Sequence, residues 1–143
     1  MGCVSCRRKV ILTDTGPLVA LLDQNEIAHS RCITVMASVG PPLVITWAVL
    51  TEAMYLLGNA GWRAQDALWR LVRRGDVELG VIGGSALARM HALMEQYRDT
   101  PMDLADASLI VLAEERNLSR IFTLDSHFYA YRLHGRQRLE IVP

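Results

Sequence analysis

The chain has 143 residues, of which 51% are hydrophobic and 21% are charged, and its 15 basic residues balance 15 acidic ones. This length predicts one domain, and the composition excludes both a disordered chain and a chain that coats nucleic acid by bulk positive charge. The sequence contains no run of about 18 apolar residues, so we expect no membrane-spanning helix and a cytoplasmic protein.

Cysteine spacing raises the question of a structural metal near the start of the chain. Cys3 and Cys6 have the C-x-x-C spacing and His29 and Cys32 have the H-x-x-C spacing, so the four side chains could together bind zinc. An isolated C-x-x-C pair is a common false positive, and we therefore favour a protein without a structural zinc site.

Strands and helices are expected to alternate along the chain after an N-terminal extension. The extension covers residues 1–8 and need not be ordered, and the predicted domain covers residues 9–143. In chain order we expect a strand at 9–14, helices at 17–24 and 27–39, a strand at 43–46, helices at 47–57 and 62–74, a strand at 77–82, helices at 86–97 and 103–116, a strand at 120–125, a helical turn at 126–131 and a strand at 138–142. Pro17, Thr46 and Gly58 are the start and stop signals behind three of these boundaries.

Three of the expected strands are short apolar runs without polar alternation, which is typical of parallel sheets with helices on both faces. Their alternation with helices predicts the α/β class: a single-domain α/β/α sandwich around a central, mostly parallel sheet of four to five strands. In such folds ligands bind beyond the carboxyl ends of the strands, so functional residues are expected there.

Four acidic residues stand alone in segments that otherwise resemble buried core. Each apolar segment has one residue of the Asp, Glu, Lys or Arg type: Asp14 in 10–22, Glu52 in 41–62, Asp106 in 104–113 and Asp125 in 121–131. Burying a carboxylate without a partner costs several kcal/mol. For Asp14 alone a helix cap is as good an explanation as a site. The set of four is better explained by a bound cation that compensates them together.

The expected elements bring these acids to one edge of the sheet. Asp14 and Asp125 end strands, and Glu52 lies in the second turn of the helix after the second strand. Asp106 lies in the first turn of another helix, and Asp103, three residues earlier, shares its face. A cluster with only oxygen ligands prefers hard cations, so we expect Mg²⁺ or Mn²⁺. Carboxylates that hold such ions are typical of enzymes that hydrolyse phosphodiesters.

With their neighbours, these acids resemble the motifs of the PIN domain family and, within it, of the VapC ribonuclease toxins of bacterial toxin–antitoxin pairs. The segments that carry the resemblance are LTDTGPLVALL, TWAVLTEAMYLL, PMDLADASLIVLAE and FTLDSHF. Each segment alone is a weak signal. The ordered set covers about residues 9–142 and is specific.

The resemblance implies a PIN-like α/β/α fold and a Mg²⁺- or Mn²⁺-dependent endoribonuclease that hydrolyses RNA phosphodiester bonds. It places the acidic site at Asp14, Glu52, Asp103, Asp106 and Asp125, with Asp103 as a companion that can act through water. It also implies that the hydroxyl of Thr123 orients an acid or the attacking water, whereas Thr15 is interpreted as a cap. A homodimer and a cognate antitoxin protein that blocks the site are implied as well.

Positive charge for RNA must come from outside the acidic segments. Residues 62–74 carry four arginines that are candidate phosphate ligands: Arg63, Arg70, Arg73 and Arg74. For any one of them a solvated helix face is the simpler explanation. Trp62 and Trp69 share a face of this helix, where packing in the core or in a dimer is favoured over stacking on bases. His127 is interpreted as structural.

A non-catalytic PIN-like module that binds RNA or protein is the alternative from another functional class. Loss of one of the four acids would indicate such a module, and all four are present, which favours the enzyme. The triplet Asp14-Thr15-Gly16 also occurs in aspartic proteases. That fold is all-β, whereas a helix is expected directly after this triplet.

Overall fold

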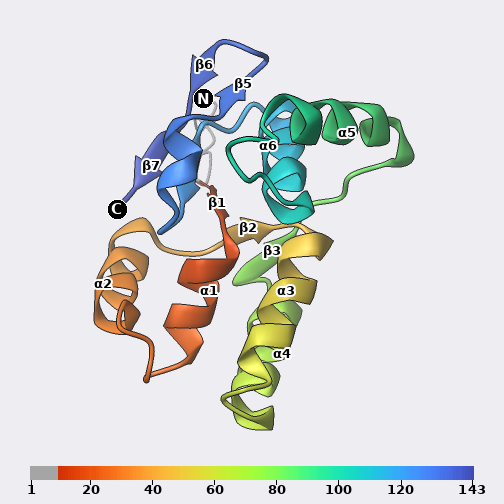
Figure 1. Cartoon of the computed structure of the whole chain (residues 1–143). Coiled ribbons are helices and arrows are strands. Elements are labelled where there is room, and N and C mark those ends of the chain that lie inside the picture. Colours follow the sequence, from red (N-terminus) through yellow and green to blue (C-terminus); the bar gives the residue numbers. More distant parts are fainter. Residues whose placement is uncertain (1–9) are drawn as a thin grey trace, which may run out of the picture.

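A computed structural model describes residues 10–143 of the chain. Five parallel strands form a sheet at the centre of the molecule (Figure 1). The strands are β1 (Ile11–Thr13), β2 (Leu43–Ile45), β3 (Val77–Leu79), β4 (Arg120–Phe122) and β7 (Glu140–Val142). Their order is β3-β2-β1-β4-β7, and each neighbouring pair is parallel. The predicted fold class is therefore confirmed, with β1 at the centre of the sheet.

Helices cover both faces of this sheet. They are α1 (Thr15–Leu22), α2 (His29–Val39), α3 (Trp47–Leu57), α4 (Trp62–Arg74), α5 (Leu87–Gln96) and α6 (Leu104–Arg116). The connections from β1 to β2 and from β2 to β3 step in one direction along the sheet, and the connection from β3 to β4 steps back. Because such crossovers are right-handed, α1–α4 lie on one face and α5 and α6 on the other, as Figure 1 shows.

The core is continuous through the sheet and into α6. The central strands are buried on both faces, which explains why their sequences lack polar alternation. Every residue of α6 from 105 to 113 is buried, Asp106 and Ser108 included. Close packing extends to the segment after β3, because a Cβ built on Gly80 would overlap the side chain of Leu112 in α6. Any larger residue at this position therefore requires the Leu112 side chain to shift.

Several predicted boundaries differ from those in the structure. Helix α1 begins at Thr15 rather than at Pro17, since Asp14 serves as its N-cap. The predicted strand at 77–82 ends at Leu79, and the one at 120–125 ends at Phe122. The predicted helix at 86–97 divides into a 3₁₀ turn, η1 (Gly84–Ala86), and α5, and the turn predicted at 126–131 is η2 (Ser126–Tyr129).

A small hairpin near the C-terminus was not expected from the sequence. The predicted last strand at 138–142 was wrong as one element, because β6 (Gln137–Arg138) pairs antiparallel with β5 (Arg132–Leu133) and β7 joins the main sheet separately. The turn contains His134 and Gly135, which have positive φ values of 52° and 74°. Strands of two residues are too short to produce a periodic pattern and therefore cannot be predicted from the sequence.

Two expectations concern the start of the chain and membranes. No helix within residues 10–143 is long and apolar enough to cross a membrane.

Cys3, Cys6 and the proposed extension lie outside the described residues. Their suggested zinc partners already serve the fold, because Cys32 is fully buried and His29 Nδ1 hydrogen-bonds to the carbonyl of Ala20 at 2.6 Å.

Candidate metal centre at the sheet edge

Three carboxylates meet at the carboxyl edge of the sheet. One oxygen each from Asp14, Asp106 and Asp125 lies within 4.8 Å of the other two. Asp14 directly follows β1, Asp125 is the third residue after β4, and Asp106 lies in the first turn of α6. Because β1 and β4 are parallel neighbours, their ends meet at one edge, and the loop before α6 brings the third carboxylate to the same place.

Asp14 is fixed by three hydrogen bonds and has two roles. Its backbone N–H donates to the carbonyl of Phe122 at 2.9 Å, which extends the pairing of β1 with β4. One carboxylate oxygen accepts from the N–H of Thr15 at 2.8 Å and caps α1, and the other accepts from the hydroxyl of Thr123 at 2.8 Å. The sequence left open whether Asp14 caps a helix or belongs to an acidic site. In the structure its carboxylate caps α1 and also lies in the group of three carboxylates.

Asp106 is held at the start of α6 by a capping box. The N–H of Asp106 donates to the carboxylate of Asp103 at 2.8 Å, and the N–H of Asp103 donates back to the carboxylate of Asp106 at 3.3 Å. This reciprocal pair satisfies two backbone donors at the helix end. The helix therefore begins at Leu104 with Asp103 as its N-cap, one residue later than predicted, and both carboxylates are oriented toward the site.

Tyr131 also reaches Asp106, and sequence reasoning missed it. Its hydroxyl donates to a carboxylate oxygen of Asp106 at 3.4 Å, and the residue is fully buried. Edge-to-face contacts with Tyr97 and Phe128, each at 5.0 Å between ring centroids, hold the ring. Burial and the charge of Asp106 raise the pKa of the Tyr131 phenol, so it remains a proton donor. In the sequence, Tyr131 resembles an ordinary aromatic core residue.

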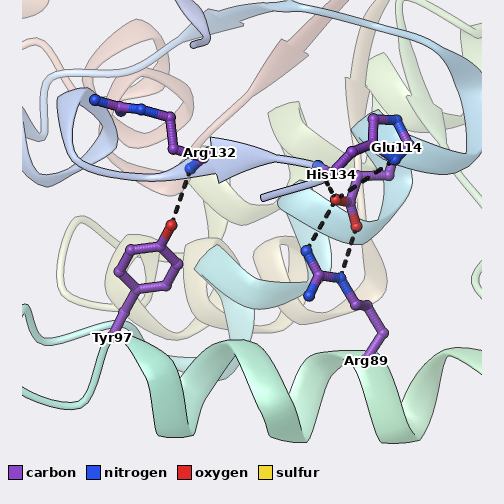
Figure 2. A network of polar contacts seen from close by, with 5 residues as sticks. All are labelled: Arg89, Tyr97, Glu114, Arg132 and His134. Atoms are coloured by element: carbon purple, nitrogen blue, oxygen red, sulfur yellow. Dashed lines mark hydrogen bonds and ion pairs between the residues drawn. The ribbon is translucent and has the colours of Figure 1, made fainter. Parts of the chain in front are cut away.

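Polar contacts fasten the segment of Tyr131 to α5 and α6 (Figure 2). The guanidinium of Arg89 donates two hydrogen bonds to Glu114, at 3.0 Å each, and the backbone N–H of His134 donates to the same carboxylate. The hydroxyl of Tyr97 accepts from the backbone N–H of Arg132 at 3.2 Å. Burial acts to raise the pKa of Glu114, but the hydrogen bonds from Arg89 and His134 outweigh burial, and the pKa of Glu114 is lowered. These contacts anchor the β5–β6 hairpin, which directly follows Tyr131, to α6 and to the end of α5.

Asp125 is oriented by its own neighbours in sequence. Its N–H donates to the hydroxyl of Thr123 at 3.0 Å, so this hydroxyl connects Asp125 with Asp14. A carboxylate oxygen of Asp125 accepts from the backbone N–H of His127 and lies 2.9 Å from His127 Nδ1. His127, interpreted as structural, therefore contacts the site through Asp125.

Glu52 and Asp103 complete the wall of an open cavity of about 290 Å³. Its lining consists of Asp14, Thr15, Gly16, Glu52, Asp103, Asp106, Leu124 and Asp125. The structure thus brings together all five acids that were predicted from the sequence. Glu52 and Asp103 lie outside the group of three carboxylates whose oxygens are within 4.8 Å of one another. The hydroxyl of Thr15 is buried in this wall and has no hydrogen-bond partner among residues 10–143.

The carboxylates raise one another's pKa values because they are buried at close range. Burial raises the pKa of Asp14 to about 6, against the hydrogen bonds from Thr123 and Thr15, and the charges of Asp125 and Glu52 add to the effect. Burial and the charge of Asp103 raise the pKa of Asp106 to about 8. Burial and Asp103 also raise the pKa of Glu52. A cation among these oxygens would remove the repulsion, and a set of carboxylates only suits a hard ion such as Mg²⁺ or Mn²⁺.

The four candidate RNA-binding arginines on α4 do not line this cavity. Arg70 pairs with Asp66 at 3.0 Å, and Arg74 pairs with Asp76 at 2.7 Å. Arg63 lines a different cavity, next to the end of α1, and Arg73 is exposed. Their role in RNA binding stays a prediction.

The two tryptophans of α4 are on the surface. Trp62 is 65% exposed and Trp69 is 41% exposed. Packing in the core is therefore wrong for both, because each ring keeps a large area open to solvent. Packing in a dimer stays open.

Comparisons with known proteins agree with this geometry. The PIN domain family matches residues 11–133 of the chain. Ribonuclease VapC26 of Mycobacterium tuberculosis is 30% identical over 135 residues, which cover 93% of this chain and all of VapC26. The crystal structure of Mycobacterium tuberculosis VapC20, described as a sarcin–ricin loop cleaving toxin, is similar in fold, with a TM-score of 0.77 at 19% identity over 84% of this chain and 93% of VapC20.

Proposed function

Because the chain belongs to the PIN domain family, we propose that it is a divalent-metal-dependent endoribonuclease and the toxin of a VapBC-type toxin–antitoxin pair. The observation that carries the proposal is the group of three carboxylates within 4.8 Å of one another at the carboxyl edge of the sheet. The similarity to a ribonuclease over the whole length of VapC26 supports the same activity.

Asp14, Asp106 and Asp125 would hold the ion, with Asp103 next to it and able to act through a water molecule. A bound Mg²⁺ or Mn²⁺ supplies an activated water and neutralises charge on the phosphate that is cleaved. Glu52 faces the same cavity from α3, where its carboxylate either completes the ion's ligands or accepts the proton of the attacking water.

Neighbouring donors would keep these carboxylates in place during the reaction. Thr123 orients Asp14, Tyr131 orients Asp106 and His127 orients Asp125, each through a hydrogen bond or close polar contact. Groups of this kind limit the freedom of a ligand and so favour one geometry of the bound ion.

Protein partners are part of the proposal. An apolar cavity of about 250 Å³ lies at the β2–β3 side of the same edge, bordered by the exposed side chains of Trp47, Leu87 and Leu104. Exposed apolar surface of this kind suits a protein contact. We assign such contacts to a homodimer and to a cognate antitoxin, which would block the acidic cavity with a basic side chain. A cytoplasmic location, where RNA is available, belongs to the same proposal.

The test is cleavage of total cellular RNA by purified protein with Mn²⁺, with Mg²⁺ and with EDTA. We expect discrete products that require metal and that disappear with Asp14→Asn and with Asp106→Asn. Asp99→Asn makes the same chemical change at an exposed carboxylate and should cut like the wild type. A folded protein, free of any copurified inhibitor, that cuts no RNA under any of these conditions would refute the enzyme and favour a PIN-like binding module.

A further inference from the structure

A second hollow adjoins the acidic cavity along the sheet edge. It has a volume of about 160 Å³ and shares Leu124 and Asp125 with the acidic cavity. Its lining includes Arg31 of α2, Tyr129 at the end of η2 and the apolar side chain of Ile141 in β7. A chain that passes the three clustered carboxylates can therefore continue directly into this hollow.

Arg31 and Tyr129 are exposed and chemically complementary to a nucleotide. Tyr129 is 64% exposed, and Arg31 is exposed and belongs to none of the ion pairs formed among residues 10–143. The backbone at Tyr129 is held in place, because Asp125 caps η2 and the guanidinium of Arg132 donates to the Tyr129 carbonyl at 2.7 Å. An aromatic ring that stacks on a base beside a cation that contacts phosphate is the common arrangement for single-stranded nucleic acid.

The charge distribution along the edge leads to the same residue. Five acids and no basic side chain line the acidic cavity, so an RNA strand meets strong negative charge there. Among the described residues that line the three cavities of this edge, Arg31 is the single Arg or Lys. By contrast, Arg70 and Arg74 on α4 are paired with carboxylates. Arg31 is thus placed to hold a phosphate next to the one that is cleaved.

We propose that this hollow, which we name the Arg31–Tyr129 subsite, binds the nucleotide adjacent to the cleaved phosphodiester of a single-stranded RNA. Tyr129 stacks on the base, and Arg31 contacts the phosphate. The inference rests on the proposed function for its substrate class, and it adds the residues that hold the strand beside the carboxylates.

The test is a binding measurement on a protein that does not cut its probe. In an Asp106→Asn background, a short fluorescein-labelled single-stranded RNA of mixed sequence is titrated at several KCl concentrations, and fluorescence anisotropy gives Kd. Arg31→Ala should weaken binding and reduce the slope of log K against log[KCl] by about 0.7, the value for one lost phosphate contact on a single strand. Tyr129→Ala should weaken binding roughly tenfold without changing that slope. Tyr129→Phe, which keeps the ring, should bind like the background protein.

The comparison variant is Arg98→Ala, which removes an exposed arginine just after α5 that lines none of these cavities. An unchanged salt slope for Arg31→Ala, or a Tyr129→Phe variant as weak as Tyr129→Ala, would overturn the proposal. So would a loss of binding with Arg98→Ala that Arg31→Ala does not show. Mn²⁺ titrations of Arg31→Ala and Tyr129→Ala, made with Asp106 intact, should give the wild-type affinity, which separates RNA binding from damage to the acids.

The two proposals can fail independently. If the wild type cuts no RNA while the Asp106→Asn protein binds the probe through Arg31 and Tyr129, the nuclease is refuted and the subsite stands. If the wild type cuts RNA and neither substitution changes binding, the nuclease stands and the subsite is refuted. A peptide that competes for this hollow while RNA does not bind there would assign it to a protein partner and refute the proposal.

Discussion

Replacing Asp14 by Asn should stabilise the metal-free protein, although it removes a central residue of the site. The folded protein raises the pKa of this carboxyl from 3.8 to about 6, so ionisation is harder in the folded state than in the unfolded state. The folded state therefore loses stability as the pH rises through this interval, and the loss is complete above about pH 6. At about 1.4 kcal/mol per pKa unit, two units correspond to about 3 kcal/mol at pH 8 and to about 0.5 kcal/mol at pH 4.

Asparagine should relieve this cost without breaking the local hydrogen bonds. Its amide oxygen can accept from the N–H of Thr15 as the carboxylate does, and asparagine is as good an N-cap as aspartate. Its amide N–H can donate to the hydroxyl oxygen of Thr123, which reverses the polarity of that contact. The free energy of unfolding of the variant in EDTA should therefore exceed that of the wild type by up to about 3 kcal/mol at pH 8.

The assay is urea unfolding followed by circular dichroism at pH 4 and at pH 8, with EDTA and with Mn²⁺. Saturating Mn²⁺ should stabilise the wild type by about 2.7 kcal/mol at one hundred times its Kd, and the variant much less, so the advantage of Asp14→Asn should shrink or reverse. Asp99→Asn, on the surface, should stay within about 0.5 kcal/mol of the wild type. A variant less stable than the wild type at pH 8 in EDTA, or an equal difference at both pH values, would refute the reasoning.

Three further predictions concern the residues around the site. Tyr131→Phe removes the hydroxyl that donates to Asp106 but keeps the packed ring. The Mn²⁺ affinity measured by calorimetry should therefore fall about tenfold or more, while the melting temperature changes little. An unchanged Mn²⁺ affinity would contradict a positioning role for Tyr131. Gly80→Ala should lower the free energy of unfolding by about 1–3 kcal/mol in urea titrations, because the added methyl overlaps the side chain of Leu112. A neutral result would mean that this side chain moves aside without cost. The lowered pKa of Glu114 stabilises the folded protein at neutral pH, and this stabilisation is lost as the pH falls below about 4.5. Glu114→Gln should therefore be less stable than the wild type at pH 7 and should approach the wild-type stability at pH 3. Equal stability at pH 7 would exclude a stabilising contribution from the Glu114 carboxylate.

Local sequence was sufficient to predict which acids form the candidate site. Asp14, Glu52, Asp106 and Asp125 stood out because each is the lone charge in an apolar segment, and a buried charge requires compensation. Their meeting point followed from a general property of parallel sheets, whose ligand sites lie at the carboxyl ends of the strands. Periodicity and caps also predicted the helices well, as Thr46 shows at the start of α3.

Contacts between distant segments were decided by the tertiary structure alone. Tyr131 meets Asp106 across 25 residues of sequence, and Arg31 and Tyr129 line one hollow from α2 and η2. The exposure of Trp62 and the pairing of the β5–β6 hairpin are of the same kind. A residue's type and spacing report its local conformation and its preference for burial, whereas its partner depends on how separate elements dock. Docking sums many weak packing terms over the whole core, and no single segment of the sequence contains that sum.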